Sequence, residues 1–137
     1  MKAYLTRRYM FSASHRLHSD AMSEEENAAT YGKCNNPYGH GHNYALAVTV
    51  SGQVDQHTGM ICNLADLDSF VAQEILDRFG HQNLNLLPEF AGSIPTTENL
   101  CIVVYDILQR GFRSAHLEGV RFEETMMNSF EYAGEKD

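Results

Sequence analysis

Apolar and polar residues alternate with a period of two in three stretches of the chain, which is the pattern of half-buried β-strands. The clearest stretch covers residues 42–51, where every second residue is apolar. Residues 2–14 show a mixed alternation, and residues 116–133 alternate again. We therefore expect one strand in each of the first two stretches and one or two strands in the last. The apolar face of the clearest strand consists of Tyr44, Leu46, Val48 and Val50.

Two further stretches have apolar residues at intervals of three and four, the spacing of an amphipathic helix. The first helix is expected to start after Asn63, a favourable capping residue, and to stop at Gly80. The second is expected to start after Thr96 or Thr97, either of which can cap it, and to end at Gly111. The apolar faces are Leu64, Leu67, Val71, Ile75 and Phe79 in the first helix and Leu100, Val103, Val104, Ile107 and Leu108 in the second.

The expected elements follow the order β-β-α-α-β-β, which predicts an α+β domain with an antiparallel sheet and two helices on one face. A length of 137 residues fits a single domain over residues 1–137. The second face of the sheet has no obvious cover within the chain, so we expect oligomerisation. Residues 18–41 predict a long loop with at most one short helical turn. A loop of this length in a compact domain is usually functional.

The chain is acidic, with a formal net charge of −8 and a pI of about 5.2. An acidic surface repels phosphate backbones, so binding to nucleic acid is not expected. A local basic pocket for a small anionic substrate remains compatible with this charge. Four cations lie near the histidines described below, and the alternative is that they are scattered surface charges. They are Arg7, Arg8, Arg16 and Lys33.

The three cysteines, Cys34, Cys62 and Cys101, form no CxxC pair and are a poor disulfide framework, which suits a reducing cytosol. The longest strongly apolar run covers residues 101–105, far too short to span a bilayer. The first eight residues lack the apolar core of a secretion signal. We therefore expect a cytoplasmic protein that does not associate with membranes.

Three histidines are expected to meet at the ends of the first two strands. His40 and His42 are two residues apart in an extended segment, so their imidazoles point to the same face. His15 ends the first strand, and antiparallel pairing would bring it to the start of the second. Three imidazoles without a fourth protein ligand are typical of a catalytic metal site. Several divalent metals suit this donor set.

Two further side chains are candidates for the same site, and each has a simpler alternative. Cys34 lies six residues before His40, and a nearby dication would favour its thiolate form, a base or nucleophile. The alternative is an inert thiol. Glu124 shares the strand parity of Val120 and Phe122, so its carboxylate faces the core side and needs a partner such as the N–H donors of a ligand. The alternative is a carboxylate that bends to solvent.

Taken together, four motifs resemble the 6-pyruvoyl-tetrahydropterin synthase family along nearly the whole chain, from about Arg7 to Tyr132. The first matches the family's first zinc motif. The second contains the catalytic cysteine and the other zinc histidines, and the last two match the pterin site. The motifs are Phe11–Leu17, Gly32–Tyr44, Pro95–Asn99 and Glu124–Thr125.

The resemblance implies a T-fold assembled into a homohexamer of two trimers, whose sheets close into barrels and whose active sites lie between subunits. It implies a zinc-dependent lyase that converts 7,8-dihydroneopterin triphosphate to 6-pyruvoyl-tetrahydropterin and releases triphosphate, a step of tetrahydrobiopterin biosynthesis. By this resemblance, His15, His40 and His42 hold Zn²⁺. Cys34 transfers protons, Glu124 anchors the pterin, and Thr96 and Thr97 flank its ring.

One position departs from the family pattern. The family has an Asp-His pair that forms a relay with the cysteine, and here Gly80 stands in place of the aspartate before His81. Without that carboxylate, the imidazole of His81 is less well oriented and its cationic form is less stabilised. Asp77 lies one helical turn earlier and is a candidate substitute. The departure bears on the reaction more than on the fold.

Two alternative functions remain open at this stage. The first is 6-carboxy-tetrahydropterin synthase of the queuosine pathway, which has the same fold. In that group the cysteine usually lies four residues before the first histidine of the HGH motif, whereas Cys34 precedes His40 by six, as in the pyruvoyl enzymes. The second is a pterin- or zinc-binding module without catalysis, supported only by Gly80. Retention of Cys34, His81 and Glu124 argues against it.

Overall fold

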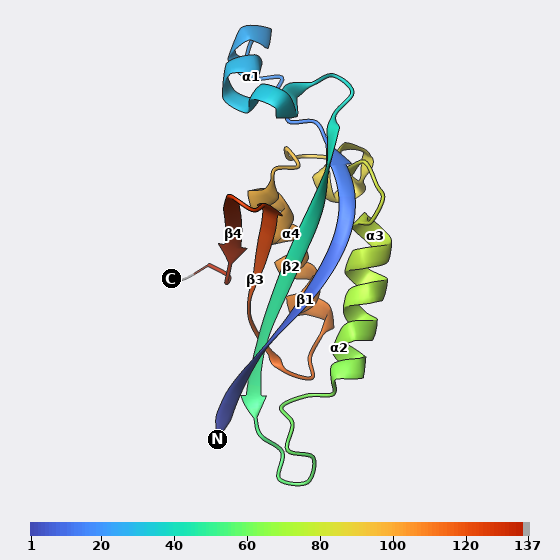
Figure 1. The fold of residues 1–137 in the computed structure, drawn as a ribbon, viewed down its shortest axis with the longest axis vertical. Coiled ribbons are helices and arrows are strands. Elements are labelled where there is room, and N and C mark those ends of the chain that lie inside the picture. Colours follow the sequence, from blue (N-terminus) through green and yellow to red (C-terminus); the bar gives the residue numbers. More distant parts are fainter. Residues whose placement is uncertain (136–137) are drawn as a thin grey trace.

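A computed structural model describes residues 1–135 of the chain. It contains one four-stranded antiparallel sheet in which the strands lie in chain order (Figure 1). The strands are β1 (Lys2–His15), β2 (His40–Gln53), β3 (His116–Thr125) and β4 (Asn128–Tyr132). This arrangement confirms the predicted α+β class. The two longest strands, β1 and β2, pair with each other.

The first predicted helix is present but is not uniform. It begins as α2, Leu64–Val71, widens into a π-helical segment, Ala72–Leu76, and ends as α3, Asp77–Phe79. Asn63 caps its start by accepting a hydrogen bond from the backbone N–H of Ala65, as predicted. The apolar stripe faces the sheet, because Leu67, Val71, Ile75 and Phe79 are fully buried.

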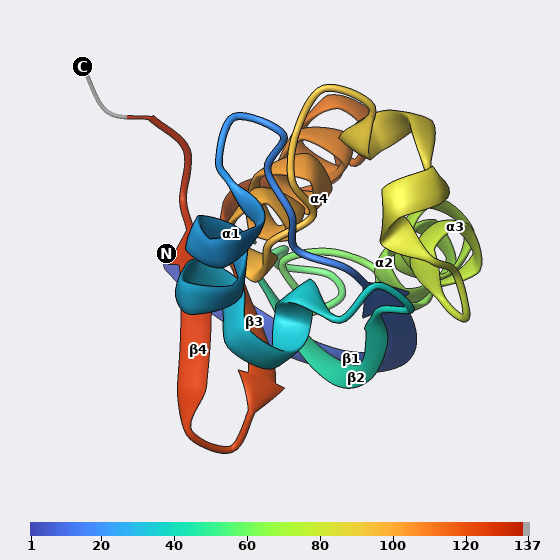
Figure 2. The same ribbon diagram turned by 90° about the horizontal axis from the view of Figure 1, so that it is seen from above.

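The second predicted helix is α4, Thr97–Gly111. Thr96 is the capping residue, since its hydroxyl accepts a hydrogen bond from the backbone N–H of Asn99. Seen along the strands, α2, α3 and α4 lie on the same side of the sheet (Figure 2). Both helices therefore cover one face, as the sequence predicted. None of the helices in residues 1–135 is long and apolar enough to cross a membrane.

The core lies between this helical layer and the sheet. The apolar face predicted for β2 is fully buried, and burying an aliphatic or aromatic side chain of this size stabilises the fold by roughly 1.5–3 kcal/mol. The opposite face remains open in the single chain, where Tyr4 is 62% and Met10 is 70% exposed. The buried residues of β2 are Tyr44, Leu46, Val48 and Val50.

The connection between β1 and β2 is more structured than the sequence predicted. It contains α1, Glu24–Tyr31, followed by a 3₁₀ helix, η1, Gly32–Asn35. Ser23 and Glu26 form a reciprocal capping box at the start of α1. Asn27 is the only buried residue of α1. The helix therefore has no apolar face from which the sequence could predict it. Two short 3₁₀ helices, Leu84–Leu86 and Pro88–Phe90, lie in the connection that precedes α4.

The register of the β1–β2 pair determines what meets at its upper end in Figure 1. His15 pairs with His40, Ala13 pairs with His42, and Phe11 pairs with Tyr44. Since residues two apart on a strand share a face, these pairs place the three histidines on the helix side. The predicted meeting of the two strand ends is therefore observed.

Candidate metal centre and active site

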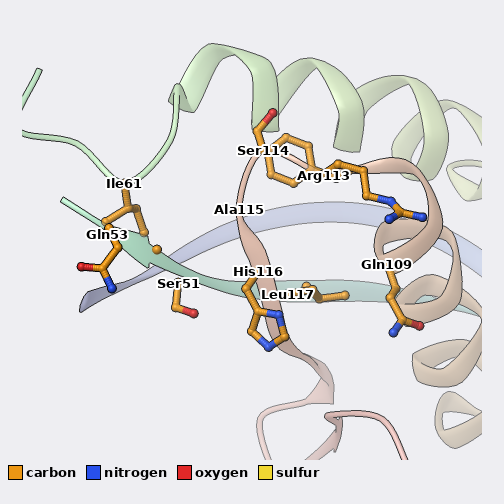
Figure 3. Close-up of a pocket in the computed structure, with 11 residues that line it drawn as sticks. Ser51, Gln53, Ile61, Gln109, Arg113, Ser114, Ala115, His116 and Leu117 are labelled. Carbon is orange, nitrogen blue, oxygen red and sulfur yellow. The ribbon is translucent and has the colours of Figure 1, made fainter. Parts of the chain in front are cut away.

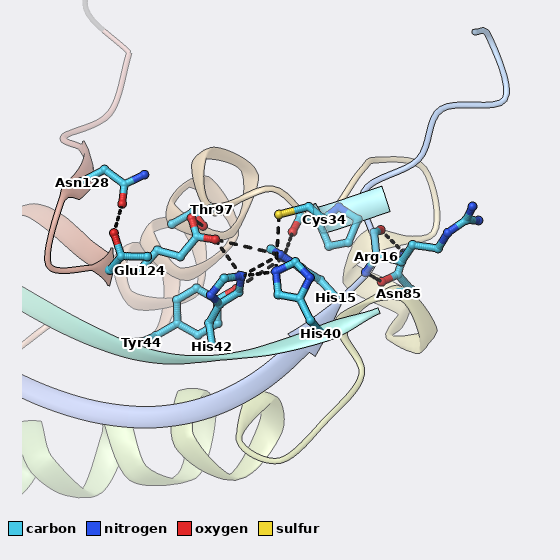
Figure 4. Close-up of polar contacts among 12 residues, drawn as sticks. His15, Arg16, Cys34, His40, His42, Tyr44, Asn85, Thr97, Glu124 and Asn128 are labelled. Carbon is cyan, nitrogen blue, oxygen red and sulfur yellow. Dashed lines mark hydrogen bonds and ion pairs between the residues drawn. The ribbon is translucent and has the colours of Figure 1, made fainter. Parts of the chain in front are cut away.

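The three histidines project from β1 and β2 toward one point (Figure 4). The Nε2 atoms of His40 and His42 are 2.9 Å apart, and those of His42 and His15 are 3.1 Å apart. The imidazole rings are inclined to one another by 74–85°. The structure thus brings together all three residues that the sequence predicted as metal ligands.

The position of His15 is fixed from behind. Its Nδ1 lies 2.9 Å from the carbonyl oxygen of Pro95 and 3.4 Å from the hydroxyl of Tyr44. A carbonyl can only accept, so Nδ1 carries the proton and Nε2 presents a lone pair to the cluster. Burial lowers the pKa of His15, which favours this neutral form. Nothing in the sequence pointed to the Pro95 carbonyl, whereas Tyr44 shares the strand parity of His42.

Hydrogen bonds alone cannot pair all the imidazole Nε2 atoms that face one another in this cluster. The Nε2 of His42 is in contact with two other imidazole Nε2 atoms and lies 2.8 Å from Oε1 of Glu124. A neutral imidazole nitrogen carries either one proton or one lone pair, so it cannot serve three partners. Burial also lowers the pKa of His42, so its cationic form is disfavoured. A divalent cation at the centre would accept all three lone pairs, and the donor set therefore fits a metal.

Cys34 joins the same cluster from η1. Its Sγ lies 3.4 Å from Nε2 of His40, and the ligand atoms of Cys34 and the three histidines all lie within 4.8 Å of one another. Burial, and then the negative charge of Glu124, raises the pKa of this thiol in the absence of a cation. Cys62 and Cys101 lie outside the cluster.

Hydrogen bonds hold the segment around Cys34 against the end of β1. The carbonyl of Cys34 accepts the backbone N–H of Leu17 at 2.6 Å. The side chain of Asn35 donates to the carbonyl of Leu17, and the carbonyl of Asn35 accepts from the guanidinium of Arg16. Asn85 in turn bonds both the N–H and the carbonyl of Arg16. Sequence reasoning missed Asn35 and Asn85 as supports of the site.

Glu124 and Thr97 form the other wall. The hydroxyl of Thr97 donates to Oε2 of Glu124 at 2.8 Å, and the Glu124 side chain is only 13% exposed. The carboxylate therefore turns toward the histidines, as strand parity predicted, and does not bend to solvent. Thr96 differs from Thr97, because its hydroxyl is used as the helix cap.

His81 lies apart from this cluster in the single chain. It follows α3 on an exposed turn, with an unusual positive φ of 58°, and its N–H is bonded to the carbonyl of Ser12. It lines a hollow of 520 Å³ together with Ser12, Asn43 and His42. Asp77 does not replace the missing carboxylate, because no hydrogen bond or ion pair joins it to His81 within residues 1–135. The Asp77 substitution suggested by the sequence is therefore not supported.

The conformation of the turn explains part of the departure at Gly80. Its N–H donates to the carbonyl of Leu76 at 2.8 Å. A Cβ built on Gly80 would overlap that same carbonyl oxygen. An aspartate could be accommodated only if the backbone of this turn moved.

The four candidate cations divide into two groups. Arg7 is paired with Asp68 of α2, and Arg8 is paired with Glu123 of β3, so neither is free for an anionic substrate. Lys33 lines a hollow of 540 Å³ that His40 and His42 also line. The expectation of a basic group beside the histidines is thus met by Lys33, with Arg16 nearby.

A further hollow of 640 Å³ lies at the opposite end of the sheet (Figure 3). Its lining includes Ser51, Gln53, Arg113 and His116. None of these side chains belongs to a group of potential metal ligands among the described residues. The histidine cluster is therefore the better candidate site.

Fold and site together define an α+β enzyme with a candidate metal centre at the end of its two longest strands. The family model described as 6-pyruvoyl tetrahydropterin synthase matches residues 4–135, and the chain belongs to this family. It is an enzyme of tetrahydropterin metabolism that acts on a pterin, and its fold is the T-fold.

The relatives support this assignment over almost the full length. The human 6-pyruvoyl tetrahydrobiopterin synthase is 46% identical over 135 residues, which cover 98% of this chain and 93% of the human protein. The solved structure of the Caenorhabditis elegans 6-pyruvoyl tetrahydropterin synthase superposes with a TM-score of 0.92 at 39% identity, covering 98% and 97% of the two chains. A putative 6-carboxy-5,6,7,8-tetrahydropterin synthase of Archaeoglobus fulgidus is 38% identical over 69 residues, or 50% of this chain and 55% of that protein.

Proposed function

We propose that the chain is a zinc-dependent lyase that converts 7,8-dihydroneopterin triphosphate to 6-pyruvoyl-tetrahydropterin with release of triphosphate. The observation that carries this proposal is the convergence of Cys34 with His15, His40 and His42 in one site. The family model that matches residues 4–135 supports the same reaction.

His15, His40 and His42 would hold the Zn²⁺. When bound there, zinc polarises hydroxyl oxygens of a substrate side chain and makes the adjacent C–H bonds more acidic. Beside it, Cys34 would remove and return protons as the side chain is oxidised and the pterin ring is reduced. No redox cofactor is required, because the oxidation is internal to the substrate.

Glu124 would anchor the pterin by accepting N–H bonds from its amino-pyrimidine edge, since charge-assisted bonds to a carboxylate are strong and directional. Thr97 supports this role because its hydroxyl already orients the carboxylate at 2.8 Å. Thr96 and Thr97 would flank the ring. Lys33, in the hollow beside His40 and His42, is suited to the triphosphate.

His81 is not among the clustered ligand residues of its own chain, which favours an assembly in which the site lies between subunits. We propose a homohexamer of two trimers, in which His81 of one chain serves the Cys34 of its neighbour. The open sheet face, with Tyr4 and Met10 exposed, supports such an assembly. Three free cysteines suit a cytoplasmic enzyme. Sedimentation equilibrium would test the assembly, and a monomer that turns over substrate would exclude the shared site.

Two alternatives follow from particular observations. The match to a putative 6-carboxy enzyme over half of the chain keeps that product open, although Cys34 precedes His40 by six residues, as in the pyruvoyl enzymes. Gly80 is the basis for a pterin- or zinc-binding module without catalysis.

A turnover assay tests all three functions at once. The zinc-loaded protein is incubated with 7,8-dihydroneopterin triphosphate, triphosphate release is followed, and the pterin product is identified by mass. We expect 6-pyruvoyl-tetrahydropterin, with activity abolished in Cys34→Ala and retained in Cys62→Ala. A 6-carboxy product with acetaldehyde would move the protein to the other activity. Tight binding without a product would reject the enzymatic proposal.

A further inference from the structure

Cys34 is spaced from its neighbour in the cluster as a fourth metal ligand would be, beside the three histidines. In tetrahedral zinc sites with Zn–N bonds of ~2.0–2.1 Å and a Zn–S bond of ~2.3 Å, neighbouring nitrogens lie about 3.3 Å apart and nitrogen and sulfur lie about 3.6 Å apart. The observed separations are 2.9 and 3.1 Å between imidazole nitrogens and 3.4 Å between Cys34 and His40. The Cys34–His40 separation is therefore close to the value expected for two ligands of one tetrahedral zinc, and the ligand atoms of all four residues lie within 4.8 Å of one another.

A site closed by four protein ligands is typical of structural zinc, whereas a catalytic site keeps one position open. The cluster can serve both states only if one of its ligands can leave. Three ligands are on paired strands of the sheet core and are held by its ladder. Cys34 differs, because it lies on the short η1 helix in the β1–β2 connection.

The carbonyl of Cys34 is held by the N–H of Leu17, whereas the position two residues earlier is loosely packed. Cys34 is partly exposed, whereas His15 is 1% exposed. Gly32, two residues before it, has a φ of +56°, and a Cβ built there would meet nothing within 4 Å. The space beside Gly32 is thus open. His40 and His42 are partly exposed like Cys34, but both lie on β2, whose ladder with β1 holds their backbone.

We propose that Cys34 is the fourth metal ligand in the substrate-free protein and that a diol-bearing pterin takes its place on entry. The second half of this inference rests on the proposed function. Exchange breaks the metal–sulfur bond without transferring a proton, so Cys34 enters the pocket as a thiolate, ready to act as the base. The Cys34 thiolate would thus stay bound to the metal until the substrate displaces it.

Glu124 is the competing fourth ligand, since its Oε1 lies 2.8 Å from Nε2 of His42. Its other oxygen is engaged by Thr97, and Oε1 lies 4.0 Å from Nε2 of His15. Both contacts are compatible with an anchor for the pterin beside the metal. A spectroscopic experiment distinguishes a sulfur ligand from an oxygen ligand directly.

The experiment uses the protein with Co²⁺ in place of zinc. A cobalt–thiolate bond gives a charge-transfer band in the near ultraviolet, which oxygen and imidazole ligands do not give. We expect this band in the substrate-free wild type, in the control Cys62→Ser and in Glu124→Gln, and its loss in Cys34→Ser. We also expect Cys34→Ser to bind metal at least about tenfold more weakly, because even indirect ligand partners have effects of this size.

The wild-type spectrum decides the first half of the proposal without any variant. Bound cobalt without a thiolate band would overturn it, as would a band that survives in Cys34→Ser. Neopterin, which carries the diol but has no triphosphate to release, tests the second half. Loss of the band on its addition supports the exchange, and a bound neopterin with an unchanged band overturns it. A protein without turnover but with the band would reject the proposed function and leave Cys34 as a ligand.

Discussion

The two ends of the β1–β2 pair have the same backbone geometry and opposite chemistry. At the end near the β2–α2 connection, the inward positions of β2 are Val48 and Val50, both fully buried among apolar neighbours. At the other end, the same alternation puts His40 and His42 on that inward face. One continuous strand therefore supplies core packing along one half and a polar cluster along the other.

This difference separates stability from chemistry along a single element. The aliphatic half contributes free energy by removing apolar surface from water. The histidine half places neutral nitrogens against one another, an arrangement that fits a bound metal. Changes in the two halves should therefore have different consequences, one for metal binding and activity and one for the free energy of unfolding.

The largest effect is expected for His42→Ala. It removes one of the proposed metal ligands, so metal affinity should fall by more than about 100-fold, since even the loss of an indirect partner costs 10–100-fold. Activity should be lost with the metal. The free energy of unfolding of the metal-free protein should change by about 1 kcal/mol or less. Metal content and turnover would be measured beside His57→Ala, a histidine of the β2–α2 connection, which should behave as wild type.

Leu46→Ala should have the opposite profile. Leu46 is fully buried between the two ends and pairs with Phe122 across the sheet. Its truncation should lower the free energy of unfolding by roughly 2–5 kcal/mol, a large part of a typical total of about 5–15 kcal/mol. Urea unfolding in the presence of a chelator would measure this loss. Metal affinity of the folded protein should be unchanged, and a parallel loss of affinity would show that the two halves are coupled.

Gly80→Asp introduces the aspartate that the family has at this position, but it should not increase turnover. The new Cβ meets the carbonyl oxygen of Leu76, so the turn must shift. We expect a loss of about 1–3 kcal/mol in the free energy of unfolding and no gain in turnover. Gly80→Ala should be similarly destabilised, whereas Gly92→Ala, where a Cβ meets nothing within 4 Å, should be tolerated. A faster and equally stable Gly80→Asp enzyme would contradict the overlap.

The smallest effect is expected for Asp68→Asn, on the helix that packs against β1. Arg7 and Tyr9 both donate to Asp68, and these bonds hold its pKa below the ordinary value of 3.8. Because the pKa is lowered on folding, the carboxylate stabilises the fold above 3.8 and loses this contribution as the pH falls through the lowered pKa. The stability difference between variant and wild type should thus be small at neutral pH and vanish in acid. Thermal unfolding across this range would measure it.

The sequence predicted the site residues on the strands better than it predicted the helices and loops around them. Strand parity has a period of two residues, so His15, His40 and Glu124 could each be assigned to a face without coordinates. The meeting of His15 with His40 followed from antiparallel pairing of neighbouring strands. By contrast, the π-helical segment after α2 has no signal in the apolar spacing, which continues through it unchanged.

The features that were missed depend on contacts between distant segments. The capping box at Ser23 was present in the sequence and could have announced α1, although the helix lacks an apolar face. The carbonyl of Pro95 could not be foreseen, because any backbone position offers such an acceptor. The overlap at Gly80 depends on how the turn closes on Leu76 and is likewise invisible in the sequence.

The register of the β1–β2 pair also gives the chain an internal indicator of correct folding. A slip of one residue would exchange the faces of β2, moving His40 and His42 outward together with the aliphatic residues. A slip of two residues would keep the faces but separate His15 from His40, with which it pairs in the native register. Retention of the proposed metal would therefore report correct strand pairing, and a metal-sensitive probe could follow refolding or sort variant libraries without any assay of turnover.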